Sequence, residues 1–80
     1  MKLNELKKGE QGEIIRINAD KTLRDRLSSF GIVRGELVTV VEHSLAKQTI
    51  EIKIGTSLVV LRANEAEKID IAEQGSQNEP

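Results

Sequence analysis

Cysteine is absent from this chain of 80 residues, and Phe30 is its only aromatic residue. Without cysteine the protein can form neither a disulfide nor a cysteine zinc site, and a reducing, cytoplasmic location is the simplest interpretation. With one aromatic residue, the core must be built from isoleucine, leucine and valine. A chain of this length is sufficient for one domain with a limited core.

Long hydrophobic runs and an excess of charge of one sign are also lacking. The N-terminal segment MKLNELKKGEQG carries charges throughout, so we expect neither a signal peptide nor a membrane anchor there. Twelve basic and thirteen acidic residues give a formal net charge of −1 at pH 7. Proteins that bind nucleic acid usually present a basic face, and single-strand binders add stacking aromatic residues. We therefore expect neither nucleic-acid binding nor direct membrane insertion.

Five short segments have the composition and alternation of β-strands. The clearest is residues 49–54, TIEIKI, in which isoleucines alternate with polar residues. Gly55 follows it in a tight turn, which predicts an antiparallel hairpin with the next apolar segment. The other predicted strands are residues 13–17, 37–42, 57–61 and 69–71.

One helix is predicted over residues 21–30. Leu23, Leu27 and Phe30 recur at spacings of four and three residues, which places them on one helix face. Asp20 and Thr22 are rival N-caps, since Thr22 has an acidic residue three positions later, as in a capping box.

Two glycines lie in the predicted corner after this helix. Gly31 fits the left-handed residue of a Schellman ending, in which Ile32 returns to contact Leu27. Gly35 opens the turn into the strand at residues 37–42. Gly31, Gly35 and the hairpin residue Gly55 are therefore assigned structural roles.

The order of these elements predicts a mostly β fold. Five short strands with one inserted helix favour a small SH3-like barrel, because closure removes exposed strand edges. A small open α+β sheet is the alternative. We place the domain at residues 1–72 and expect residues 73–80 to form a disordered polar tail.

The sequence contains little that is typical of a catalytic or metal-binding site. The phosphate-binding pattern GxxxxGK[ST] is absent, and His43, the only histidine, has no evident nucleophile or orienting partner. Glu42, His43 and Glu51 could meet across a strand pair as metal ligands, but consecutive residues of a strand face opposite ways. We therefore predict no enzyme activity, no metal site and no cofactor.

Arginines gather on and just after the predicted helix. Arg24 and Arg26 lie within it, and Arg34 follows it. One interpretation is a solvated helix face, whose surface ion pairs contribute little to stability. The other is a docking surface for an acidic or mixed-charge partner. The residues alone leave both open.

Three segments together resemble the FeoA family of ferrous iron transport accessory proteins: LNELKKGEQGEI, LRDRLSSFGIVRGELVTVV and IEIKIGTSLVVLRANEAEKIDI. The family's elements follow in order: a Leu-x-x-Leu-x-x-Gly start, a Leu-Arg-x-Arg-Leu helix, a Leu-Gly-Ile-x-Pro-Gly corner and an Ala-Leu-Arg strand end. The last two appear here as Phe30, Gly31, Ile32 and Gly35, and as Val60, Leu61 and Arg62. The resemblance spans about residues 3–71. Two departures are Arg34, where proline is usual, and SLAKQT, where a Pro-Leu-Gly-Asp-Pro-like segment is usual.

The resemblance implies an SH3-like barrel that acts by contact, as a cytoplasmic accessory of the membrane ferrous iron transporter FeoB. The alternatives are a metal-responsive regulator and a nucleic-acid-binding module, and self-association through strand edges is left open. Leu27 is a candidate whose period also fits the core. The candidate partner-binding residues are Arg24, Leu27, Ser28, Val33 and Arg34.

Overall fold

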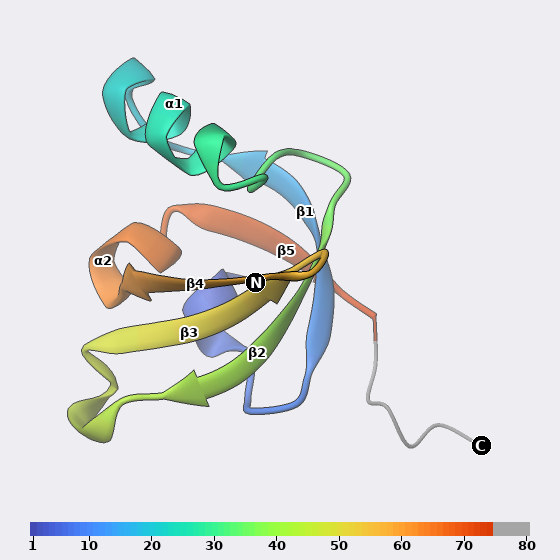
Figure 1. Ribbon diagram of the computed structural model, residues 1–80, viewed down its shortest axis with the longest axis vertical. Coiled ribbons are helices and arrows are strands. Elements are labelled where there is room, and N and C mark those ends of the chain that lie inside the picture. The colour runs from blue at the N-terminus through green and yellow to red at the C-terminus, as the bar shows by residue number, and fades with distance from the viewer. Residues whose placement is uncertain (75–80) are drawn as a thin grey trace.

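The computed structural model describes residues 1–74. All five predicted strands and the helix are confirmed, with bounds that differ by at most two residues. None of the described helices is long and apolar enough to cross a membrane. The elements, labelled in Figure 1, are η1 (Leu3–Glu5), β1 (Gln11–Ile17), α1 (Lys21–Ser29), β2 (Leu37–His43), η2 (Leu45–Lys47), β3 (Thr49–Ile54), β4 (Ser57–Arg62), α2 (Ala63–Ala66) and β5 (Ile69–Glu73).

The strands form one antiparallel sheet in the order β4-β3-β2-β1-β5. The sheet curves strongly, and the single turn of α2 connects its two edge strands, β4 and β5 (Figure 1). The helix α1 is inserted between β1 and β2 and projects from one end of the sheet. The predicted mostly β fold is therefore confirmed.

The core lies inside the curved sheet and is entirely aliphatic. Alternation along β3 places three isoleucines inside, and β2 and β4 contribute valine and leucine in the same way. η1 adds two leucines from the N-terminal arm. The buried cluster consists of Leu3, Leu6, Ile14, Leu27, Ile32, Val38, Val40, Ile50, Ile52, Ile54, Val59, Leu61, Ala66, Ile69 and Ile71.

The predicted apolar face of the helix is wrong at Phe30. Leu27 is fully buried and Leu23 is partly buried, but Phe30 is 38% exposed. Because α1 projects from the end of the sheet, Leu27 is its one fully buried residue, and Leu23 packs against the core at its margin. The ring of Phe30 instead lies against the guanidinium of Arg26, whose Cζ is 5.9 Å from the ring centroid.

Hydrogen bonds define both ends of α1. Asp20 is the N-cap, because its Oδ1 accepts from the Leu23 amide at 2.9 Å, so the rival cap at Thr22 is not used. At the other end, the amide of Ile32 donates to Leu27 O at 3.0 Å, and that of Gly31 donates to Ser28 O at 2.9 Å. These two bonds confirm the Schellman ending.

All three glycines assigned to the fold have a positive φ, which is +85° at Gly31, +94° at Gly35 and +59° at Gly55. Gly31 also lies close to β3, since an added Cβ would approach the Ile54 Cγ2 to 3.3 Å. Gly35 donates its amide to Ile14 O at 2.7 Å, so the corner is bonded to β1. The chain can take this path because glycine adopts left-handed backbone without a steric cost.

A buried carboxylate, Asp70 on β5, connects three distant segments. It accepts from Lys2 Nζ at 2.6 Å, Arg16 Nε at 3.1 Å and Asn18 Nδ2 at 3.0 Å. These donors, led by Lys2, hold the pKa of Asp70 well below its usual range. The N-terminal arm is thereby fixed against β5.

The domain extends past the predicted boundary at residue 72. β5 runs to Glu73, and the amide of Gln74 donates to Gln11 O at 2.9 Å. Glu73 therefore belongs to the sheet and not to the predicted tail. Residues 75–80 of that tail lie outside the described residues.

Replacing Gly31 by valine is expected to destabilise the fold. A left-handed backbone costs a residue with a side chain about 1–2 kcal/mol, and the added atoms would also press on Ile54. We expect the melting temperature to fall by about 4–8 °C for each kcal/mol lost. Thr22→Ala, an exposed change within α1, is the control and should melt close to the parent protein. An unchanged midpoint for Gly31→Val would contradict the cap.

Replacing Asp70 by asparagine should lower stability in a pH-dependent way. The folded state holds the pKa of Asp70 below its unfolded value of about 3.9, so ionised Asp70 stabilises the fold above that pH. We expect the parent protein to melt higher than Asp70→Asn at pH 7, and the gap to narrow as the pH falls below about 4. Asp25→Asn, which removes an exposed pair with Lys21, should change little at either pH. A gap that stays constant down to pH 2 would contradict this role.

Candidate functional site

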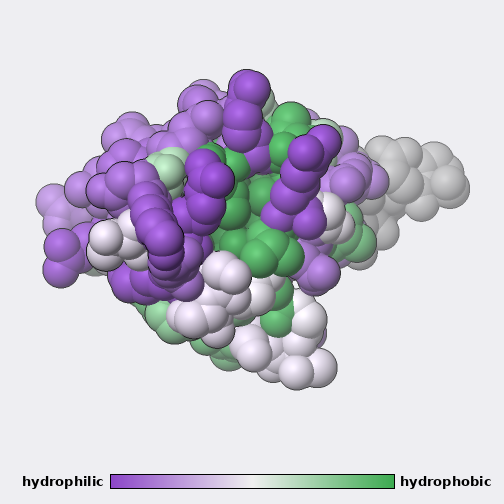
Figure 2. Space-filling view, turned by 90° about the horizontal axis from the view of Figure 1, so that it is seen from above, coloured by the Kyte–Doolittle hydropathy of each residue, from purple (hydrophilic) through white to green (hydrophobic). Residues whose placement is uncertain are grey.

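An open groove lies between the second half of β1 and the helix α1 with its exit. Its volume is about 650 Å³. Figure 2 looks onto this end of the molecule and shows hydrophobic surface between projecting hydrophilic side chains. Four of the five predicted partner-binding residues line the groove: Arg24, Ser28, Val33 and Arg34.

The floor of the groove is apolar. Ile15 from β1 is 45% exposed, and Val33 from the corner is 37% exposed. Ile17 and the fully buried Ile32 lie beside them and connect the floor to the core. Exposed aliphatic side chains in a hollow of this kind are typical of a surface that contacts another molecule.

The rim of the groove is positively charged, although the whole chain has a net charge of −1. Arg16, Arg24 and Arg34 contribute three guanidinium groups. The carboxylate on the lining belongs to Asp25, and its Oδ2 already accepts from Lys21 Nζ at 2.7 Å. The local field therefore favours an anionic ligand.

Different contacts position the three arginines. Arg24 Nη2 donates to the carbonyl oxygens of Ile17 at 3.1 Å and Ala19 at 3.5 Å, which draws the side chain back along the groove. Arg16 donates through Nε to Asp70, which leaves the outer part of its side chain exposed. Arg34 is exposed in the turn, and no hydrogen bond from its side chain occurs within residues 1–74.

The groove exists because β1 is paired unequally on its two sides. β2 pairs with β1 only over Gln11–Glu13, and the last main-chain bonds on that side are made by Ile14. β5, on the other side, accompanies β1 as far as Ile17. Beyond Ile14 the corner after α1 takes the place of β2 beside β1, so residues 15–17 line the groove.

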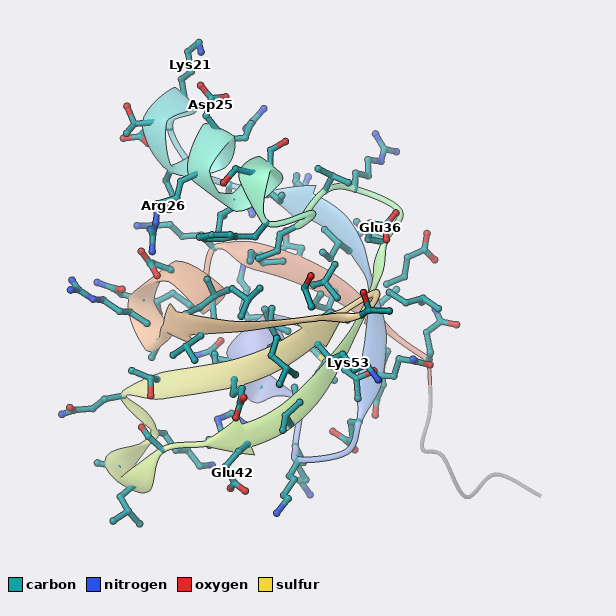
Figure 3. All side chains as sticks on the ribbon, viewed as in Figure 1. Lys21, Asp25, Arg26, Glu36, Glu42 and Lys53 are labelled. Atoms are coloured by element: carbon teal, nitrogen blue, oxygen red, sulfur yellow. The ribbon has the colours of Figure 1, made fainter. Side chains whose placement is uncertain are left out.

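Two contacts fix α1, which forms the opposite wall. Leu27 is buried in the core, and Arg26 Nη1 donates to Glu65 Oε2 on α2. In Figure 3 the labelled Arg26 points from α1 towards α2, away from Lys21 and Asp25 on the outer side of the helix. The bond with Arg26 also lowers the pKa of Glu65.

The prediction of Leu27 as a partner-binding residue is corrected by its burial. Its side chain has no exposed surface, so it anchors the helix and cannot contact a partner. Conversely, the sequence analysis missed Ile15, Arg16 and Ile17 as groove residues. The segment EIIRI offered one indication, since consecutive isoleucines in a strand face opposite ways and one must point away from the core.

The residues considered as metal ligands do not form a cluster. Glu42 and Glu51 are opposite one another on β2 and β3, but Glu42 pairs with Lys8 Nζ at 2.9 Å, which lowers its pKa. His43 Nε2 donates to Leu6 O at 2.8 Å. Among residues 1–74, no three histidine or carboxylate side chains are grouped so that they could hold a metal ion.

Comparison with known sequences gives consistent results. The family model described as the FeoA domain matches residues 1–73. A protein of Campylobacter jejuni named as an Fe(2+) transport protein A is 41% identical over 71 residues, covering 89% of this chain and 96% of that protein. A Porphyromonas gingivalis protein, named as a fusion of Fe(2+) transport protein A with the Fe(2+) transporter FeoB, is 32% identical over 71 residues, covering 89% of this chain and 8% of the fusion.

Solved structures show the same fold. The solution structure of a FeoA protein from Chlorobium tepidum superposes with a TM-score of 0.88 at 35% identity, covering 94% of this chain and 71% of that one. FeoA of Stenotrophomonas maltophilia, described as a prokaryotic SH3 domain protein, superposes with a TM-score of 0.74 at 24% identity, covering 90% and 89% of the two chains. The expected SH3-like fold is thus confirmed, and with the family model and the sequence relatives it shows that this chain belongs to the FeoA family.

Proposed function

We propose that this protein is a cytoplasmic accessory of ferrous iron uptake that binds the cytoplasmic part of a FeoB-type transporter and modulates its activity or assembly. The Porphyromonas gingivalis relative supports this proposal, because its name places an Fe(2+) transport protein A and FeoB in one chain. Two proteins that are fused in one organism commonly act together in another. The role requires binding and no chemical step by the accessory itself.

The observation that carries the proposal is the arginine-rimmed groove. It combines exposed aliphatic residues with three guanidinium groups, and arginine is enriched at protein interfaces over the rest of the surface. Arginine is also among the residues that contribute most to binding energy at interfaces. The groove walls are held by the Schellman corner and by the contact between Arg26 and Glu65, so the surface is preorganised.

Charge reversal at the rim tests this function. Arg24→Glu combined with Arg34→Glu should weaken co-purification with the cytoplasmic part of the FeoB-type transporter from the same organism by about tenfold or more, since like charges at an interface oppose association. The matched control is Lys53→Glu combined with Arg62→Glu, which changes the net charge equally at exposed positions outside the groove. Melting curves of both variants establish that each is folded.

Two outcomes would contradict the proposed surface. Unchanged binding and unchanged iron uptake in the groove variant would remove the groove as the docking site. Equal loss in the groove variant and the control would show that overall charge, and not this surface, governs the association.

A further inference from the structure

On the side away from β5, the second half of β1 is a strand edge without a neighbouring strand among residues 1–74. Ile14 makes the last main-chain bonds towards β2, donating to Glu36 O at 2.9 Å and accepting from the Gly35 amide at 2.7 Å. Within residues 1–74, Arg16 and Ile17 are then paired with β5 alone, and Ile15 lies in a bulge of that pairing. An unpaired edge of this kind is a template on which another extended chain can form main-chain hydrogen bonds.

The position of Arg24 shows that this edge faces the groove. Its Nη2 donates to Ile17 O at 3.1 Å, so a side chain takes the place that an N–H of an adjacent strand would occupy. That bond joins a guanidinium to a neutral carbonyl. A carboxylate could instead pair with the Arg24 guanidinium through two parallel hydrogen bonds between opposite charges, which a single carbonyl oxygen cannot offer.

The dimensions and composition of the groove suit a short extended segment. Three strand residues span about 10 Å, and the groove volume is about 650 Å³. Side chains of an extended segment alternate between two faces. One set can therefore contact Ile15 and Val33 on the floor, while the other reaches the arginines on the rim.

The charges lining the groove determine which charge the rim-facing side chains of the bound segment should carry. Three guanidiniums line the groove, and its carboxylate, that of Asp25, is already paired with Lys21. A segment with carboxylates would pair with Arg24 and Arg34, whereas a basic segment would be repelled. Phosphate groups would satisfy the rim but leave the aliphatic floor unused.

We propose that the groove binds an acidic, extended segment of the partner protein, which adds to β1 at residues 15–17 as a short strand and places its carboxylates against Arg24 and Arg34. The proposal rests on the proposed function, since it names the chemistry of the segment that the accessory recognises. Glutamate or aspartate alternating with aliphatic residues is the sequence that fits.

An NMR titration of the full ¹⁵N-labelled chain tests the proposal directly. The probe is an acetylated and amidated eight-residue peptide of alternating glutamate and valine. We expect its addition to shift the amide signals of residues 15–17 and 31–34, with affinity that falls as salt is raised. Arg24→Glu combined with Arg34→Glu should weaken binding at least tenfold, and Lys53→Glu combined with Arg62→Glu should leave it unchanged.

Two control peptides separate charge from main-chain pairing. A peptide of alternating lysine and valine should not bind, because it reverses the charge. A peptide of alternating glutamate and proline keeps the charge but lacks half of the N–H donors, so it should bind at least tenfold more weakly. The proposal is overturned if the glutamate–valine peptide causes no shifts at millimolar concentration, if its shifts lie outside the groove, or if either control peptide binds equally well.

A negative result in the peptide titration and a negative result in the co-purification experiment lead to different conclusions. If the peptide does not bind but co-purification still depends on Arg24 and Arg34, the extended acidic segment is rejected as the ligand of the groove. The proposed function is then unaffected. Peptide binding as expected, with no association with the cytoplasmic part of the transporter, would establish the specificity of the groove and reject the proposed partner.

Discussion

The left-handed backbone at Gly31 is the constraint on which the rest of the structure depends. It turns the chain so that the Ile32 amide donates to Leu27 O, and the side chains of both residues enter the core. With few buried residues of its own, α1 takes its direction from this return together with the contact of Arg26 with Glu65 on α2. The same turn places Val33 and Arg34 beside β1, so one hydrogen-bonded corner both closes the core and forms a wall of the groove.

The protein uses its charges in two contrasting ways. Asp70 is buried and satisfied by three donors, which makes it a structural anchor for the N-terminal arm and β5. The groove instead presents Arg24 and Arg34, with cationic groups that exceed the carboxylates around them. Arg16 belongs to both arrangements, since Asp70 holds its Nε while its outer part remains at the rim. A nearly neutral chain thereby acquires a local positive surface without a basic composition.

The insertion of a helix between β1 and β2 has a cost for the sheet, because it ends their pairing early. The outer edge of β5 is partly covered by the N-terminal arm, where Ile71 donates to Met1 O at 2.7 Å and Lys2 bridges Asp70. Among the described residues, the second half of β1 has only the Arg24 side chain in the equivalent position. Small β proteins usually protect such edges against unwanted pairing. An edge that a charged side chain covers is protected from aggregation but can still be opened by a suitable ligand.

The sequence by itself determined the features that depend on neighbouring residues. Alternation located the strands, spacing located the helix, and the glycine after it identified the Schellman ending, because these patterns reflect bonds that span a few residues. Only the tertiary structure decided that Phe30 is exposed, that Leu27 is buried and not available to a partner, and that Asp70 joins segments up to 68 residues apart. It also added Ile15, Arg16 and Ile17 to the groove, since their exposure depends on where β2 begins and how α1 leaves the sheet. Burial and charge pairing are properties of contacts between distant segments, and no local pattern specifies them.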